Sequence, residues 1–190
     1  MLFRSAFSAE NAAWCAKQIE KYPPGRQASA VIPILWRAQE QEGWVTKPIV
    51  ETVAAMLGMP YIRVLEVATF YTMFNLHPVG EHLVQVCTTT PCWLRGSDDV
   101  VAACKKHIHP HQGAISPDGK FSWIEMECLG ACVNAPMLLV DKDPYEDLDG
   151  PKTEALLEAI RRGEKPKPGP QNGRRSSEPE GGATTLKGNE

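Results

Sequence analysis

The residues best suited to chemistry in this sequence are four cysteines that lie in two pairs. Cys87 and Cys92 are separated by four residues and Cys128 and Cys132 by three, with 35 residues between the pairs. Four thiolates bind a [2Fe–2S] cluster, two to each iron, whereas zinc ribbons mostly use spacers of two residues. The spacing therefore favours an iron–sulfur cluster, and a zinc site or unliganded thiols remain as alternatives.

The surroundings of the two pairs suit such a cluster. With four thiolates it carries a net charge of about −2, so it favours backbone N–H donors and a positive field. We expect a helix capped by Ser97, together with Arg95, to supply them. Gly130 permits a tight turn between the second pair. Four apolar side chains are expected to keep water from the sulfides: Leu94, Leu129, Ala131 and Val133.

Other residues of ligand type are better explained without a metal. Cys15 and Cys104 fall on the apolar faces of predicted helices, which indicates core packing. The three histidines of segment 107–111 follow the last turn of a helix, where neutral or positive groups suit the dipole. The acidic segment 141–147 lacks the ligand pattern and glycine of an EF-hand loop, so we interpret it as a solvated loop.

No catalytic residue is predicted. The sequence contains no G-x-G-x-x-G, phosphate-binding loop or G-x-S-x-G motif. A [2Fe–2S] cluster accepts one electron at a time, so a substrate that delivers a hydride needs a second group, normally a flavin, to separate the two electrons. We therefore expect that this chain does not carry out hydride chemistry alone.

The elements that position the cysteines fall into two regions of different periodicity. Residues 8–75 carry apolar residues at helical spacing in four short segments, with Thr46 as an N-cap and Gly43 and Gly58 as helix ends. The later pattern is strand, helix, strand, strand, helix, with each cysteine pair just after a strand end. These elements are expected at 82–86, from 97, and at 121–127, 137–140 and 152–162.

These patterns predict an α+β protein with three parts. Residues 1–79 form an N-terminal helical bundle, residues 80–163 a small α/β domain that holds the cysteines, and residues 164–190 an extended tail. The tail is rich in Pro, Gly and Ser and cannot form a core of its own. Pro166, Pro168 and Pro170 stiffen it toward an extended form that suits docking on a partner.

Composition excludes several classes of protein. The chain has 190 residues, 43% of them hydrophobic, a net charge of −3 and a pI near 6.0, which does not suit a nucleic-acid-binding surface. No apolar run reaches the length of a membrane span, and the first residues lack a signal-peptide pattern. We expect a protein of the reducing bacterial cytoplasm, with no membrane insertion, whose cysteines are thiols or metal ligands.

Several motifs resemble those of one family. The segments VCTTTPCWLRGS, PDGKFSWIEMECLGACVNAPM and PKPGPQNGR, and the earlier YPPGRQASAVIPILWRAQEQEGW and EVATFYTMF, are similar to the E subunits of NADH-quinone oxidoreductase, respiratory complex I. The resemblance runs from about Ser8 into the tail. It implies a helical N-terminal part, a thioredoxin-like domain, and one [2Fe–2S] cluster on Cys87, Cys92, Cys128 and Cys132.

The resemblance also implies partners. One is a flavoprotein subunit that binds FMN and NADH, and another is the large iron–sulfur subunit, both within complex I on the cytoplasmic face of the inner membrane. The cluster would lie beside the flavin as a side store for one electron, and the tail would run along the flavoprotein. On this basis truncation after Gly163 is expected to weaken the pair while leaving the cluster spectrum unchanged. Ser177 stands where many relatives have a cysteine that is not a ligand.

Other functions stay open on the sequence. Related subunits serve NAD-reducing hydrogenases and NAD-dependent formate dehydrogenases, and the tail after Gly163 argues against both. A zinc-stabilised interaction module is the alternative from another class. A free thioredoxin-like ferredoxin is disfavoured, because such a carrier needs neither the N-terminal helices nor the tail.

Overall fold

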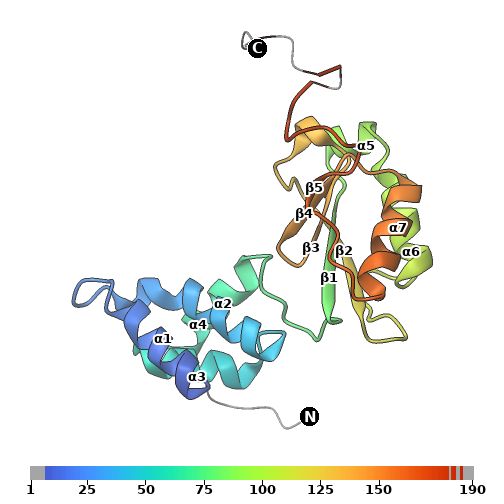
Figure 1. The fold of residues 1–190 in the computed structure, drawn as a ribbon. Helices are drawn as coiled ribbons and strands as arrows, with labels where there is room; N and C mark the ends of the chain where they lie inside the picture. Colours follow the sequence, from blue (N-terminus) through green and yellow to red (C-terminus); the bar gives the residue numbers. More distant parts are fainter. Residues whose placement is uncertain (1–6, 180, 183–184, 186–190) are drawn as a thin grey trace. The chain divides into compact units, whose positions relative to one another are not determined.

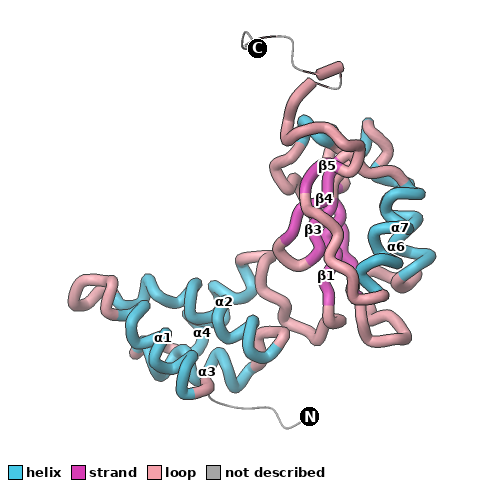
Figure 2. Tube along the Cα trace, viewed as in Figure 1, coloured by secondary structure: helices cyan, strands magenta, loops and turns pink. Residues whose placement is uncertain are grey.

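The computed structural model describes residues 7–179, 181–182 and 185. The chain forms two compact units, Met1–Val79 and Gly80–Glu190. The first is helical and the second is built around a mixed sheet (Figures 1 and 2). The predicted α+β class, with N-terminal helices followed by a thioredoxin-like domain, is confirmed. Within the described part of the chain, no helix is long and apolar enough to cross a membrane.

The N-terminal unit contains four helices whose ends follow from the sequence. The Ser8 side chain accepts a hydrogen bond from the Asn11 amide, and Thr46 does the same for Ile49, so both act as N-caps. Gly43 and Gly58 end their helices with φ of 83° and 61°. The elements are α1 Ala9–Ile19, the 3₁₀ turn η1 Gln27–Ala30, α2 Val31–Glu42, α3 Lys47–Leu57 and α4 Tyr61–Phe70. Their shared core includes Cys15, Ile34, Leu35, Ile49, Val53 and Val64.

The second unit is a five-stranded sheet in the order β2-β1-β3-β4-β5. The β1–β2 and β4–β5 pairs are parallel, and β3 runs antiparallel to both of its neighbours. The strands are β1 His82–Cys87, β2 Phe121–Met126, β3 Leu138–Val140, β4 Asp143–Glu146 and β5 Gly169–Pro170. The remaining elements are α5 Thr90–Leu94, α6 Ser97–His107, the 3₁₀ turn η2 Cys132–Asn134 and α7 Gly150–Arg161.

Helices α6 and α7 pack against each other beside one face of the sheet (Figure 1). Alternate strand residues such as Val84 and Val86 face this layer, as the period of two in a strand requires. They meet helix residues such as Val100 and Leu157. The fully buried side chains of this core include Val84, Val86, Val100, Cys104, Phe121, Trp123, Leu138 and Leu157.

The first residue of the second unit is a glycine for a steric reason. A Cβ on Gly80 would lie 2.5–2.8 Å from the backbone N, Cα and C atoms of Phe121. The Gly80 amide also donates to the Ser122 hydroxyl at 2.9 Å. Together these contacts hold the entry of β1 tightly against β2, which sets the register that carries Cys87 to the far end of the strand.

A short irregular segment borders one side of the sheet, and the two-residue strand β5 forms the other side. Beyond β2, the Gly113 and Ser116 amides each donate to β2 carbonyls at 2.8 Å. Beyond β4, the chain returns after α7 and forms β5, red in Figure 1. The Gln171 amide donates to the Glu146 carbonyl at 2.9 Å, and the Tyr145 hydroxyl donates to the Pro166 carbonyl at 3.2 Å. Two residues of the predicted tail, Gly169 and Pro170, are therefore part of this sheet, and the residues beside them bond to it.

Two expectations about this unit are wrong. Ser97 is not an N-cap: the cap position is Gly96, with φ of 99°, and the Ser97 side chain is buried without a hydrogen-bond partner. The acidic segment 141–147 is not a solvated loop, because it contains β4, with Tyr145 3% exposed and Asp147 8% exposed. Pairing with β3 and β5 outweighs the polar composition of this strand.

Candidate functional site: two cysteine pairs at one end of the sheet

Parallel pairing of β1 and β2 brings the two cysteine pairs to the same end of the sheet. Cys87 is the last residue of β1 and pairs in register with Met126, the last residue of β2. Cys128 follows Met126 by two residues, so its segment continues beside Cys87. Cys92 lies within α5, a short helix that the sequence pattern did not indicate, and Cys132 begins η2.

The four sulfurs form two close pairs that also interact with each other. The Sγ atoms of Cys128 and Cys132 are 3.6 Å apart. Two thiolates on one tetrahedral metal, with bonds of about 2.3 Å, lie about 3.8 Å apart. Cys92 donates to Cys87, and Cys132 interacts electrostatically with both. Across the described ranges, no three or more Cys, His, Asp and Glu side chains are arranged to hold a metal ion. A [2Fe–2S] cluster takes two thiolates at each iron.

The two pairs differ in exposure and in acidity. Cys87 and Cys92 are 1% and 0% exposed, whereas Cys128 and Cys132 are exposed. Burial raises the pKa of Cys92 to about 12, and its hydrogen bond to Cys87 acts in the same direction. Burial also acts to raise the pKa of Cys87, but hydrogen bonds from the Thr89 hydroxyl and the Leu129 and Thr89 amides outweigh it, so that pKa is lowered. The hydrogen bond that Cys132 donates to Cys128 raises the Cys132 pKa.

The chemistry of this donor set fits a [2Fe–2S] cluster. Four thiols are present, and backbone amides already point at two of the sulfurs: those of Leu129 and Thr89 at Cys87, and that of Met137 at Cys92. These amides provide the donors that we had expected from a helix N-terminus at Ser97. Gly130 has φ of 88°, the left-handed conformation expected for the tight turn between Cys128 and Cys132.

The predicted apolar lining is half right. Leu129 and Ala131 are partly buried and pack with Cys87, Cys92, Ala135 and Met137. Leu94 and Val133 do not shield the site, because they are 70% and 69% exposed. Trp93, which follows Cys92, is also 57% exposed. Exposed apolar side chains therefore follow Cys92 and Cys132, whereas those between Cys128 and Cys132 are partly buried.

The remaining ligand-type residues have structural partners. Cys15 and Cys104 are fully buried in the two cores, and burial raises the pKa of Cys104 to about 12. His107 ends α6 and lies 3.1 Å from a Glu158 carboxylate oxygen. His109 and His111 contact each other through a ring nitrogen and a backbone amide. That none of these residues is a metal ligand stays a prediction.

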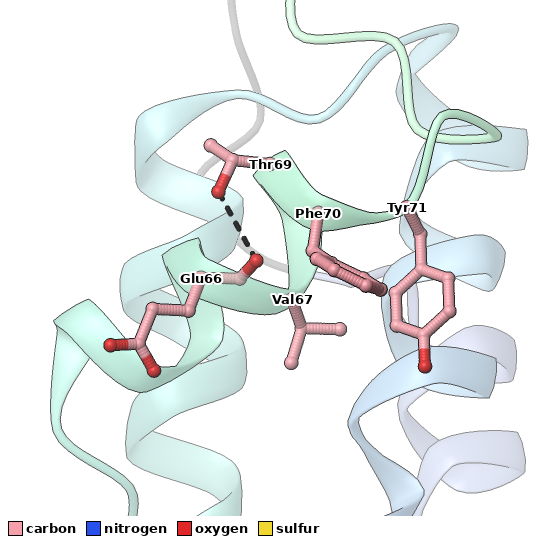
Figure 3. A pocket seen from close by; sticks show the side chains of 5 residues that line it. All are labelled: Glu66, Val67, Thr69, Phe70 and Tyr71. Carbon is pink, nitrogen blue, oxygen red and sulfur yellow. Dashed lines mark hydrogen bonds between the residues drawn. The ribbon is translucent and has the colours of Figure 1, made fainter.

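An exposed, largely apolar hollow lies on the last turn of α4. It measures about 410 Å³ and is lined by Glu66, Val67, Thr69, Phe70 and Tyr71 (Figure 3). The Thr69 hydroxyl donates to carbonyls one turn earlier in its own helix, and Glu66 forms an ion pair with Arg63 at 2.9 Å. Phe70 is 76% exposed, so this face is mainly hydrophobic.

Sequence reasoning missed three residues beside the second cysteine pair. Arg174 of the tail forms a nearly buried ion pair with Asp147, which follows β4, and it also donates to the Val133 carbonyl at 3.2 Å. Asn134 donates from its side chain to the Ser176 carbonyl at 3.1 Å. Only the opposite charges of Asp147 and Arg174, far apart in the chain, could have suggested the pair. Neither segment has a periodicity that brings them together.

Comparisons with known proteins agree with this geometry. The family model described as thioredoxin-like [2Fe–2S] ferredoxin matches residues 15–161. The chain is 55% identical over 184 residues to an E subunit of NADH-quinone oxidoreductase from Rhizobium meliloti (strain 1021), covering 95% of this chain and 67% of that protein. It is 52% identical over 157 residues to the corresponding E subunit from Rickettsia bellii (strain RML369-C), covering 82% and 94%.

More distant similarities agree as well. NADH dehydrogenase [ubiquinone] flavoprotein 2, mitochondrial, of Dictyostelium discoideum is 46% identical over 95% of this chain and 73% of its own length. A crystal structure of an NAD⁺-reducing [NiFe]-hydrogenase has the same fold, with a TM-score of 0.63 at 18% identity. That match covers 71% of this chain and only 22% of the hydrogenase chain. The chain belongs to the thioredoxin-like [2Fe–2S] ferredoxin family, among the E subunits of NADH-quinone oxidoreductase.

Proposed function

We propose that this chain is the electron-transfer subunit of the NADH dehydrogenase module of complex I, with one [2Fe–2S] cluster bound by Cys87, Cys92, Cys128 and Cys132. The observation that carries the proposal is the convergence of two cysteine pairs at one end of the sheet, one buried and one exposed. The names of its relatives support the assignment to NADH-quinone oxidoreductase.

The chain's own residues perform two tasks in this function. The cluster, when bound, supplies one-electron chemistry. Cys87 and Cys92 would hold it from within the domain, where Leu129, Ala131 and Met137 limit access of water. Cys128 and Cys132 would hold it from the surface. Trp93 and Leu94, which follow Cys92, and Val133, which follows Cys132, are exposed and suit an apolar contact with an electron donor.

A partner must supply hydride chemistry, because this sequence contains no dinucleotide-binding motif. We propose that it is the subunit that binds FMN and NADH, and that the large iron–sulfur subunit completes the module. The complex would lie on the cytoplasmic face of the bacterial inner membrane. The likeness to an NAD⁺-reducing hydrogenase concerns the fold and does not favour that function.

Metal analysis of the full-length chain from iron-replete cells tests the cluster. We expect about two irons and two acid-labile sulfides per chain. Serine at any of the four ligand positions should reduce the iron content by at least half. Cys15→Ala and Cys104→Ala are the matched controls, because both cysteines lie in the cores and away from the site. Stoichiometric zinc in place of iron would overturn the proposal and support a zinc-stabilised interaction module.

Activity provides a second test. The isolated chain should not reduce ferricyanide with NADH, and addition of the flavoprotein subunit should restore the reaction. Turnover by the flavin-free chain alone would contradict the proposed division of labour.

A further inference from the structure

The tail passes directly over the loop that carries the second cysteine pair. After β5, the side chains of Asn172 and Arg174 line a hollow of about 200 Å³ together with Arg95, Cys132 and Asp147. This places residues far apart in sequence around one of the four cysteines. The tail is thus part of the surroundings of the cysteine site as well as an edge of the sheet.

Arg174 is held there by a nearly complete set of hydrogen bonds. Its side chain is 13% exposed and that of Asp147 7%. Two of its nitrogens donate to the two Asp147 oxygens, a bidentate pair. The guanidinium also donates to the Glu178 carbonyl at 3.0 Å and to the Val133 carbonyl at 3.2 Å. A nearly buried ion pair is costly unless its remaining donors are satisfied, and here backbone carbonyls satisfy them.

These contacts fasten the loop of Cys132 from outside the sheet. Val133, whose carbonyl Arg174 binds, directly follows Cys132. One residue further, the Asn134 carbonyl accepts from the Asp147 amide at 2.7 Å, and the Asn134 side chain donates to the Ser176 carbonyl. The turn η2, in which Cys132 and Val133 are exposed, is therefore tied through Asn134 to the end of β4 and to the tail.

The charge of Arg174 has a second effect. Reduction adds one negative charge to a cluster that is already anionic, so a nearby guanidinium stabilises the reduced form more than the oxidised form. Loss of this charge would also leave the Asp147 carboxylate unpaired beside Cys132. Both changes make reduction harder.

We propose that Arg174 is a positioning residue of the cluster site, which fastens the Cys132 loop to the domain and raises the reduction potential of the cluster. The proposal rests on the proposed function, since it assumes a [2Fe–2S] cluster on the four cysteines. The sequence predicts that removal of the tail leaves the cluster spectrum unchanged. On this proposal its removal would also change the reduction potential of the cluster and the rate of iron loss.

Four full-length variants carrying the cluster test this assignment, with the potential measured by spectroelectrochemical titration. In Arg174→Gln the equilibrium constant for one-electron reduction should fall about tenfold, which is about 59 mV for a one-electron couple. Loss of iron to a chelator should become at least tenfold faster. Arg174→Lys keeps the charge and should keep the potential, while loss of iron becomes faster. Asp147→Asn should shift the potential in the opposite direction. Arg175→Gln removes the same charge from the adjacent residue and should change neither property.

The possible outcomes separate the inference from the function on which it rests. If Arg174→Gln and Arg175→Gln have equal potentials and equal rates of iron loss, Arg174 is not a positioning residue. If the wild-type chain binds no iron, the proposed function fails. In that case hydrogen exchange still tests whether Arg174 holds the Cys132 loop in place. The Asp147 amide should exchange at least tenfold faster in Arg174→Gln than in the wild type. Unchanged exchange would overturn the fastening too.

Discussion

Replacement of Gly80 by alanine should destabilise the cysteine-bearing unit strongly. The new Cβ would lie 2.5 Å from the carbonyl carbon of Phe121 and 2.7 Å from its nitrogen. Carbon atoms in contact normally lie about 3.5–4.0 Å apart, so one backbone segment must move by about 1 Å. The obstructing atoms belong to the β2 backbone, which is fixed by its pairing with β1. A rotamer change cannot relieve this overlap.

The expected cost of Gly80→Ala is at the upper end of the range for overpacked sites, about 3 kcal/mol. This should lower the Tm of the unit by about 10–20 °C. Urea titrations followed by fluorescence would measure the change, because Trp123 on β2 is 1% exposed and its emission shifts when the sheet opens. The transition of the helical unit should stay unchanged, since the contact lies within the second unit.

Gly150→Ala is the matched control for this experiment. Its new Cβ would lie 3.7 Å from Asp99 atoms, an ordinary contact, and the residue begins α7. Its stability should stay equal or rise by up to about 1 kcal/mol. If the free energy of unfolding of Gly80→Ala lies within about 0.5 kcal/mol of the wild-type value, contact with β2 is not the reason why position 80 is glycine. That result would refute the reasoning.

Three further changes probe other parts of the second unit. Gly130→Ala meets no atom within 4 Å but forces alanine to φ of 88°, so it should cost about 1–2 kcal/mol in urea unfolding and speed the loss of iron. Cys104→Ser buries a hydroxyl and should cost about 1–3 kcal/mol, while Cys104→Ala should cost less and both should keep the iron. Hydrogen bonds from the Ser116 hydroxyl and the Lys120 amide, and the guanidinium of Arg161, hold the pKa of Asp118 at about 2. That carboxylate stabilises the fold above about pH 4, and its contribution is lost as the pH falls toward 2. The gap in urea midpoint between wild type and Asp118→Asn should therefore close over that interval, and a constant gap would contradict the assignment.

Helix ends and the cysteine pairs could be predicted because their signals are local. Thr46 caps α3 through its own side chain, and Gly43 and Gly58 adopt the left-handed conformation that ends a helix. The cysteine pairs follow strands whose apolar residues alternate, so their position at strand ends could also be predicted from the sequence. That they meet at one end of the sheet depends on parallel pairing of β1 and β2.

Features that depend on pairing between distant segments could not be predicted. β4 has the composition of a loop and becomes a strand because β3 and β5 lie on either side of it. β5 has two residues, too few for any periodicity. Ser97 has the residue type of an N-cap, but Gly96 adopts the cap position and the serine is buried. Leu94 and Val133 are apolar yet exposed, which the spacing of the cysteines does not reveal.

The segments that cover the outer edges of β2 and β4 affect self-association. An exposed strand edge offers unpaired amides and carbonyls to another chain, which leads to edge-to-edge aggregation. Here the amides of Gly113 and Ser116 donate hydrogen bonds to β2 carbonyls on one side of the sheet. On the other side β5 pairs with β4. Pro170 in β5 has no N–H to offer a further strand. A chain that ends after α7 would expose β4 and the ring of Tyr145, so its tendency to aggregate would rise even before any partner is lost.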